Sequence, residues 1–332
     1  MDLDAMTAAH RHEWERLDEL SRARRLAAGE QVDELITRYR AASADLAEMK
    51  TAAGRSVQAD HLSLVLSRAR LRLTGAGENV LRRIPRFFLR QLPTALYRVR
   101  WMTLVVAGAF VLASGLVAAW ISSDPALLAS LGSEAQLSAY ARDEFTGYYT
   151  ENPAAVFAGT VWTNNAWIAA QCVLFGITGI WPVYVVVQNA VGIGTAAAVM
   201  AGYDRLDVFF AFILPHGLLE LTCIFVAAAA GLQIFWAWVA PGRRSRAESL
   251  ASAGRSLATV AIGLVFALAL SGVVEGYVTP QPWPVAVKIA LGAAALAVFL
   301  VYMLLVGGRA VRRGESGDMT EDDIGAPEVV AG

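Results

Sequence analysis

Long apolar segments separated by charged connections constrain this sequence most strongly. About 20 apolar residues, at a rise of 1.5 Å per residue, cross a hydrocarbon core of roughly 30 Å. Trp101 and Trp120 flank the first such segment, as aromatic residues often do at membrane surfaces. The sequence therefore predicts an all-α protein, a polytopic six-helix transmembrane bundle, with spans near residues 102–121, 156–176, 180–201, 207–239, 257–276 and 285–307.

The composition supports membrane insertion and argues against a disulfide-stabilised fold. Hydrophobic residues make up 56% of the chain and charged residues 17%, whereas about a quarter of a typical soluble domain is charged. The two cysteines, Cys172 and Cys223, both lie in apolar segments, so neither a disulfide scaffold nor a zinc ribbon is expected. An early apolar region of a signal peptide is not apparent, so we expect an internal span to direct membrane insertion.

The charges of the connections predict the orientation. Arginines precede the first span and recur at residues 243–246, Arg255 and 309–313, whereas the segment 122–155 has several acidic residues and only Arg142. Because arginine-rich connections stay on the cytoplasmic side, six spans would place both termini in the cytoplasm. Five or seven spans would put one arginine cluster outside. The predicted location is a bacterial plasma membrane.

Three further parts flank the spans. Residues 1–81 have helical apolar periodicity and predict a cytoplasmic helical arm, which is either a small bundle or a partner-binding coiled coil. Residues 82–100 predict a basic amphipathic interfacial segment, bent at Pro93, that binds lipid headgroups rather than nucleic acid. Its cations are Arg82, Arg83, Arg86, Arg90, Arg98 and Arg100. The tail at residues 309–332 is predicted to be disordered.

Polar residues inside the predicted spans form the candidate site, because such groups usually face the interior of a bundle. The candidate residues are Asn164, Asn165, Gln188, Asn189, His216 and Glu220, and Gln171 and Glu275 are further polar residues of the predicted spans. His216 and Glu220 share a helix face, while Pro215 and Gly217 predict a helix break beside them. The site is interpreted either as a kink stabilised by hydrogen bonds or as a functional site for a metal, a proton or a substrate. With only two ligands evident, no metal is predicted, and no cofactor or catalytic set is expected.

Small residues mark a close helix contact in the third predicted span. Ala190, Gly194, Ala198 and Gly202 recur at four-residue spacing, so they line one face and allow another helix to approach closely. The sequence leaves open whether that helix belongs to the same chain or to a second copy in a homo-oligomer.

The run Leu214-Pro215-His216-Gly217-Leu218-Leu219-Glu220, followed by the segment 224–227 and Gly231, resembles the signature of the stage II sporulation protein M family. The pair Asn164-Asn165 and the element 188–192 are similar to other polar landmarks of that family. The resemblance covers about residues 85–307. It implies a bacterial membrane protein and, from the family's namesake, a scaffold for peptidoglycan-degrading enzymes without an established activity of its own.

Two main functional hypotheses follow. The first is a scaffold or assembly factor, not an enzyme, whose partners are membrane lipids and cell-envelope proteins. It would contact these proteins through the arm and through aromatic residues of the external segment 122–155, namely Tyr140, Phe145, Tyr148 and Tyr149. The alternative is a transporter or lipid-handling protein with a cavity lined by the intramembrane polar residues. An intramembrane hydrolase ranks below both because a complete catalytic set is missing.

Overall fold

The computed structural model describes residues 3–23, 29–53, 56–73, 84–149 and 153–318. Within these ranges the secondary structure is helical and contains no β-strand. The chain divides into two compact units, residues 1–84 with 320–332 and residues 85–319. The predicted all-helical class is therefore confirmed for the described residues.

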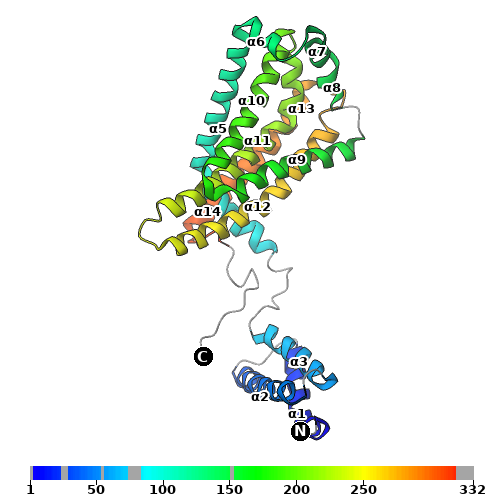
Figure 1. The fold of residues 1–332 in the computed structure, drawn as a ribbon, viewed down its shortest axis with the longest axis vertical. Helices are drawn as coiled ribbons and strands as arrows, with labels where there is room; N and C mark the ends of the chain where they lie inside the picture. The colour runs from blue at the N-terminus through cyan, green and yellow to red at the C-terminus, as the bar shows by residue number, and fades with distance from the viewer. Residues whose placement is uncertain (1–2, 24–28, 54–55, 74–83, 150–152, 319–332) are drawn as a thin grey trace. The chain divides into compact units, whose positions relative to one another are not determined.

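The first unit contains three helices, α1 (Leu3–Arg22), α2 (Glu30–Ala53) and α3 (Val57–Leu73), drawn in blue in Figure 1. Leu17, Leu35 and Leu62 come one from each helix and are fully buried in a shared apolar core. The Trp14 indole donates a hydrogen bond to Asp45 over 2.9 Å, which fixes α1 against α2. These contacts describe a three-helix bundle with its own core.

The second unit contains the long apolar helices together with several short helical elements (Figure 1). In chain order they are the π-helical turn η1 (Phe87–Gln91), α5 (Leu92–Ser123), α6 (Pro125–Ser130), α7 (Glu134–Ala139), the π-helical turn η2 (Tyr140–Glu144), α8 (Phe145–Gly147), α9 (Ala154–Leu174), the 3-10 turn η3 (Gly176–Thr178), α10 (Ile180–Gly202), α11 (Leu206–Val239), α12 (Arg246–Tyr277), α13 (Val285–Val301), the π-helical turn η4 (Tyr302–Val306) and α14 (Gly307–Arg312).

Five helices of the described part are long and apolar enough to cross a membrane. They comprise Ile84–Ser123, Ile180–Gly202, Leu206–Val239, Arg246–Tyr277 and Val285–Arg312. Helix α9 is not among them, although it occupies the second predicted span. Asn164, Asn165 and Gln171 reduce the hydropathy of this helix. A membrane protein with five candidate spans is thus the direct structural result.

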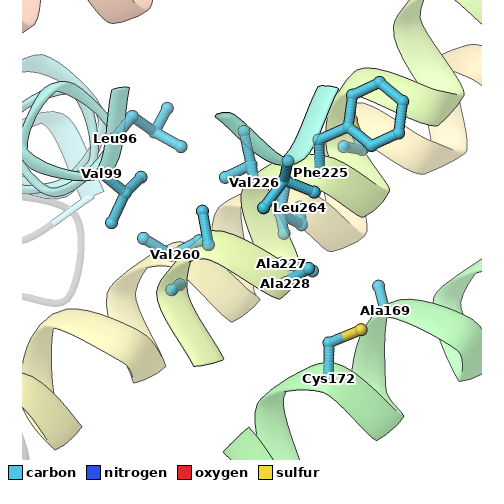
Figure 2. Close-up of a cluster of buried hydrophobic side chains, with 14 of the residues drawn as sticks. Leu96, Val99, Ala169, Cys172, Phe225, Val226, Ala227, Ala228, Val260 and Leu264 are labelled. Carbon is cyan, nitrogen blue, oxygen red and sulfur yellow. The ribbon is translucent and has the colours of Figure 1, made fainter. Parts of the chain in front are cut away.

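Helix α11 lies at the centre of the second unit. Its run of four alanines, residues 227–230, is almost completely buried and packs in the main apolar core. Figure 2 shows part of this core, in which Val226 and Phe225 of α11 lie near Leu264 of α12. At Gly231 a methyl group would come within 2.2 Å of the Cys172 carbonyl oxygen, so glycine is required for this close approach of α9 to α11.

The structure differs from the expected interfacial segment at residues 82–100. From Ile84 to Ser123 the chain forms one continuous helical segment, and Leu92, Leu96 and Val99 lie in the main core. The turn η1 accommodates Pro93 by shifting the hydrogen-bond register, since the N–H of Leu92 donates to Phe87. The apolar face of this segment is therefore covered by protein. Arg82 and Arg83 lie outside the described residues.

The beginning of the predicted disordered tail is ordered. Residues 309–312 belong to α14, and the following residues return to the bundle. Asp318 accepts a hydrogen bond from Ser252 over 3.0 Å, and Glu315 pairs with Arg90 over 3.4 Å. The prediction of disorder is therefore wrong up to residue 318, because these polar contacts hold the segment, and residues 319–332 lie outside the described part.

The small-residue face of α10 packs against α5 of the same chain. A methyl group on Gly194 would lie 2.6 Å from the Ser114 carbonyl oxygen, and Ala190 and Ala198 are buried. A methyl group on Gly202 would lie 2.8 Å from a side-chain carbon of Leu128 in α6. The helix that approaches these small residues therefore belongs to the same chain and not to a second copy.

Candidate functional site

The site is built around α11, which continues through Pro215 without a break. The predicted helix break at Pro215 and Gly217 is wrong, since α11 runs from Leu206 to Val239 with proline inside it. A proline removes one helical hydrogen bond, but tight packing on both sides of a helix can preserve its course. Gly292 of α13 supplies such packing, because a methyl group at this position would lie 2.1 Å from the Pro215 carbonyl oxygen.

Three ionisable side chains meet beside this point. His216 and Glu220 project from one face of α11, and Glu275 reaches them from the last turns of α12. One ligand-type atom from each residue lies within 4.8 Å of the others. The Nε2 atom of His216 is 3.7 Å from Oε1 of Glu275. We refer to His216, Glu220 and Glu275 as the His–Glu–Glu cluster.

Hydroxyl and ammonium groups surround this cluster. The Nδ1 atom of His216 lies 3.3 Å from the hydroxyl of Thr279, and Ser271 donates to the His216 carbonyl over 3.1 Å. Lys288 donates to the Thr279 carbonyl over 2.8 Å, so it connects α13 to the end of α12. These contacts join three helices through polar groups.

The cluster is shielded from solvent. His216 is 5% exposed, Glu275 is 3% exposed, and Glu220 is half-buried. Tyr149, from the segment between α5 and α9, places its ring 5.8 Å from the imidazole and covers it. Burial, together with the nearby carboxyl group of Glu275, raises the pKa of Tyr149, so its phenol remains neutral.

The structure brings only some of the predicted polar residues together. Asn165 is buried and lies next to the Glu220 carboxyl group. Asn164 and Gln188 are exposed, so their assignment to a buried cluster is wrong. Asn189 is half-buried and donates to the Val185 carbonyl of its own helix. The two exposed residues lie on the outer faces of α9 and α10, because the inner faces are filled by alanine, glycine and apolar residues.

Sequence reasoning missed half of the polar site. Ser271, Thr279 and Lys288 were not considered, and Glu275, although noted at the end of the fifth predicted span, was not assigned to the cluster; each of the four is almost fully buried. A charged residue at the end of an apolar segment is the signal that could have identified Glu275 and Lys288, because such residues are costly there without partners. The position of Thr279 could not be inferred, since it depends on the fold of the connection after α12.

The arrangement can do two things chemically. Two carboxyl groups and an imidazole can exchange or share a proton, and the same groups are common ligands of divalent metals. No solvent-open hollow is needed for either. Four surface cavities of about 290–690 Å³ lie in the part of the chain that the structure describes, and none of these four is lined by a member of the His–Glu–Glu cluster.

The aromatic residues of the segment 122–155 do not form one exposed patch. Phe145 and Tyr149 are buried against Phe209 and Phe212 of α11. Tyr140 is half-buried, whereas Tyr148 is 55% exposed. The interpretation of these residues as an exposed cluster is therefore wrong for all but Tyr148, because the α11 rings offer an apolar surface on which the others pack.

The fold and the buried polar cluster define an all-helical polytopic membrane protein. The family model described as Stage II sporulation protein M matches residues 102–280, more than half of the chain, and the chain belongs to this family. The resemblance seen in the Pro-His-Gly run is thus confirmed. A second model, described as a domain of unknown function (DUF8413), matches residues 4–75. No curated protein and no solved structure matches the chain.

Proposed function

We propose that this chain is a scaffold or assembly factor for envelope-remodelling proteins in a bacterial plasma membrane. One observation supports this role above transport: the polar cluster is shielded from solvent, with His216 and Glu275 only 5% and 3% exposed and Glu220 half-buried. None of the four surface cavities of about 290–690 Å³ in the described part is lined by its members. A transport site must open to at least one side of the membrane, whereas a scaffold requires a stable bundle and exposed surfaces. The predicted polar residues also fail to line one cavity, since Asn164 faces outward.

In the proposed topology α9 also crosses the membrane, which brings the five candidate spans to a total of six. It contains 21 residues, which corresponds to about 31 Å of helix and matches the thickness of the hydrocarbon core. Asn165 faces Glu220 rather than lipid, which lowers the cost of including α9 in the membrane. Six spans place the arginines at 243–246 and 309–313 on one side, the cytoplasm, with both termini.

Cysteine labelling tests this topology. The native Cys172 and Cys223 are both buried, so they give a low background with a membrane-impermeant maleimide. Ser130→Cys, beyond α5, should react in intact cells, whereas Ala247→Cys, an exposed position in the first turn of α12 next to the arginine-rich connection, should react only after lysis. Labelling of both variants in intact cells would refute the six-span arrangement.

The proposed partner surface lies on the external segment 122–149. Its exposed residues include Tyr148 and the acidic side chains of Glu134, Asp143 and Glu144. Tyrosine is enriched at protein interfaces because it combines a large apolar ring with a hydrogen-bonding group. The surrounding carboxylates favour a basic partner surface through charge complementarity.

Site-specific photocrosslinking tests the scaffold role. A photoreactive amino acid at Tyr148 should capture envelope proteins, identified by mass spectrometry. Trp236 is the matched control, because it is a similarly exposed aromatic residue near the other end of the bundle, with 51% exposure. Failure to recover envelope proteins at Tyr148, or recovery of the same set at both positions, would contradict the proposed surface.

A further inference from the structure

The His–Glu–Glu cluster has a ligand set that sequence analysis did not reveal. His216 and Glu220 alone supply two ligands from α11, but Glu275 adds a third from α12. Three protein ligands are the usual number in a zinc site that keeps one position for another group. Their ligand-type atoms lie within 4.8 Å of one another, so one ion can reach all three with small side-chain adjustments.

The spacing between His216 and Glu275 fits a shared metal ion better than a direct hydrogen bond, whereas the two carboxyl groups interact with each other. The distance of 3.7 Å from His216 Nε2 to Glu275 Oε1 exceeds that of a normal hydrogen bond. Two ligands on a tetrahedral zinc ion, at metal–ligand distances of about 2.0–2.2 Å, lie roughly 3.3–3.6 Å apart. The observed separation is close to that range.

The surroundings of the imidazole orient it as a ligand. Thr279 places its hydroxyl 3.5 Å from the Val274 carbonyl, to which it donates, and so it can accept from Nδ1–H of His216 at 3.3 Å. That assignment leaves the lone pair of Nε2 directed toward the two carboxyl groups. A hydrogen bond to the second ring nitrogen is the usual way in which proteins fix a metal-binding histidine.

Unpartnered carboxyl oxygens provide an independent indication that the cluster can accept a cation. Oε2 of Glu220 and Oε2 of Glu275 are buried and have no hydrogen-bond partner among the described residues. The Glu275 side chain is 4% exposed. Buried carboxyl oxygens are costly unless a donor or cation satisfies them. The nearby ammonium of Lys288 is directed to the Thr279 carbonyl.

We propose that His216, Glu220 and Glu275 bind one divalent transition-metal ion, with zinc or manganese as the fitting chemistry. The ion joins α11 to the end of α12 and neutralises both carboxylates. One imidazole with two carboxylates suits either metal. This site is independent of the proposed scaffold role, because metal binding requires no envelope partner.

Metal binding to the wild-type protein is the primary test. The full chain is purified in detergent, stripped with a chelator, and titrated with zinc chloride alone or manganese chloride alone. One equivalent of metal per protein chain should bind, as measured by inductively coupled plasma mass spectrometry after desalting. At a free metal concentration of 100 times Kd, linkage should raise Tm by roughly 5 °C or more.

Matched variants locate the bound ion. Glu275→Gln preserves the side-chain size but removes an anionic ligand, so it should lower the metal affinity at least tenfold. Glu144→Gln is the control, because it makes the same chemical change at an exposed carboxylate outside the cluster. His61→Gln controls for adventitious binding in the first unit. Both controls should retain one equivalent of metal and the Tm increase.

The outcomes are distinguishable even if Glu275→Gln fails to fold. A pair of carboxyl groups that share a proton would leave the wild-type Tm unchanged by metal or chelator, and this result would overturn the proposal. Binding that is abolished by His61→Gln but unaffected by Glu275→Gln would also overturn it. Loss of crosslinked partners with intact metal binding would count against the scaffold alone.

Discussion

The contact between Gly292 and Pro215 gives the most direct test of how this bundle is packed. In Gly292→Ala the new methyl group would lie 2.1 Å from the Pro215 carbonyl oxygen and 2.7 Å from its carbonyl carbon. Both are backbone atoms, so no side chain can rotate away. An ordinary van der Waals contact would require α11 and α13 to separate by roughly 1 Å.

The size of the effect follows from two opposing contributions. Overpacking of a closely packed interior typically costs about 1–3 kcal/mol, while replacing glycine by alanine within a helix gains up to about 1 kcal/mol. Because the clash involves backbone on both helices, we expect the overpacking cost to prevail. The free energy of unfolding should fall by about 1–3 kcal/mol, which lowers Tm by roughly 2–10 °C for a unit of this size.

The assay is thermal unfolding of the purified full chain in detergent, with fluorescence and size-exclusion chromatography as readouts. Gly192→Ala in α10 is the matched control, because a methyl group there has no atom within 4 Å. This control should leave Tm unchanged or raise it slightly. If Gly292→Ala were as stable as Gly192→Ala, the close approach of α13 to Pro215 would be wrong.

Three further predictions concern other parts of the chain. Trp14→Ala removes a buried ring and the donor to Asp45, so it should cost the three-helix bundle about 3–5 kcal/mol and allow proteolysis within residues 1–84 while the second unit stays intact. Burial raises the pKa of Asp18, but hydrogen bonds from Arg22 and Arg68 outweigh it and lower the pKa overall. The ionised Asp18 therefore stabilises the bundle at neutral pH, and this stabilisation is lost as the pH falls through the lowered pKa. Asp18→Asn should weaken the acid dependence of unfolding measured by circular dichroism. Ser245→Ala removes the cap of α12 and should lower Tm by roughly 2–4 °C in a thermal scan.

The long helices could be predicted from sequence because hydropathy and length are local properties. Helices α10, α11, α12 and α13 all coincide with apolar segments of sufficient length. The exception is α9, where the amide groups lower the hydropathy although the helix forms. Its Asn165 finds a place beside Glu220, and that compensation is visible only in three dimensions.

The course of the backbone at prolines could not be predicted in the same way. Pro215 favours a helix break when considered alone, yet α11 is continuous because α13 packs against it at Gly292. Pro93 favours a bend, yet the π-helical turn before it keeps the segment helical. In both cases tertiary packing or a register shift overrides the local effect of the imino acid.

The candidate site shows the same limit for side chains. His216 and Glu220 could be placed together because they lie four residues apart on one helix. Their contact with Glu275 joins two different helices, and the sequence contains no spacing rule that connects these positions. Asn164 and Gln188 were misplaced for a related reason, because polarity alone does not say which helix face is covered.

The location of the His–Glu–Glu cluster links the bundle to the surface proposed for partners. Glu275 lies in the last turn of α12, and Thr279 follows in the connection to α13. Tyr149 covers His216, while its neighbour Tyr148 is exposed on the same segment. The ring of Tyr149 packs on Phe212 and His216 of α11, so a displacement of this part of α11 would move Tyr149 and, through the chain, affect the exposed Tyr148. A filled cluster would hold this segment in one position, which gives a buried ion a physical route to influence binding at the surface without being in contact with a partner.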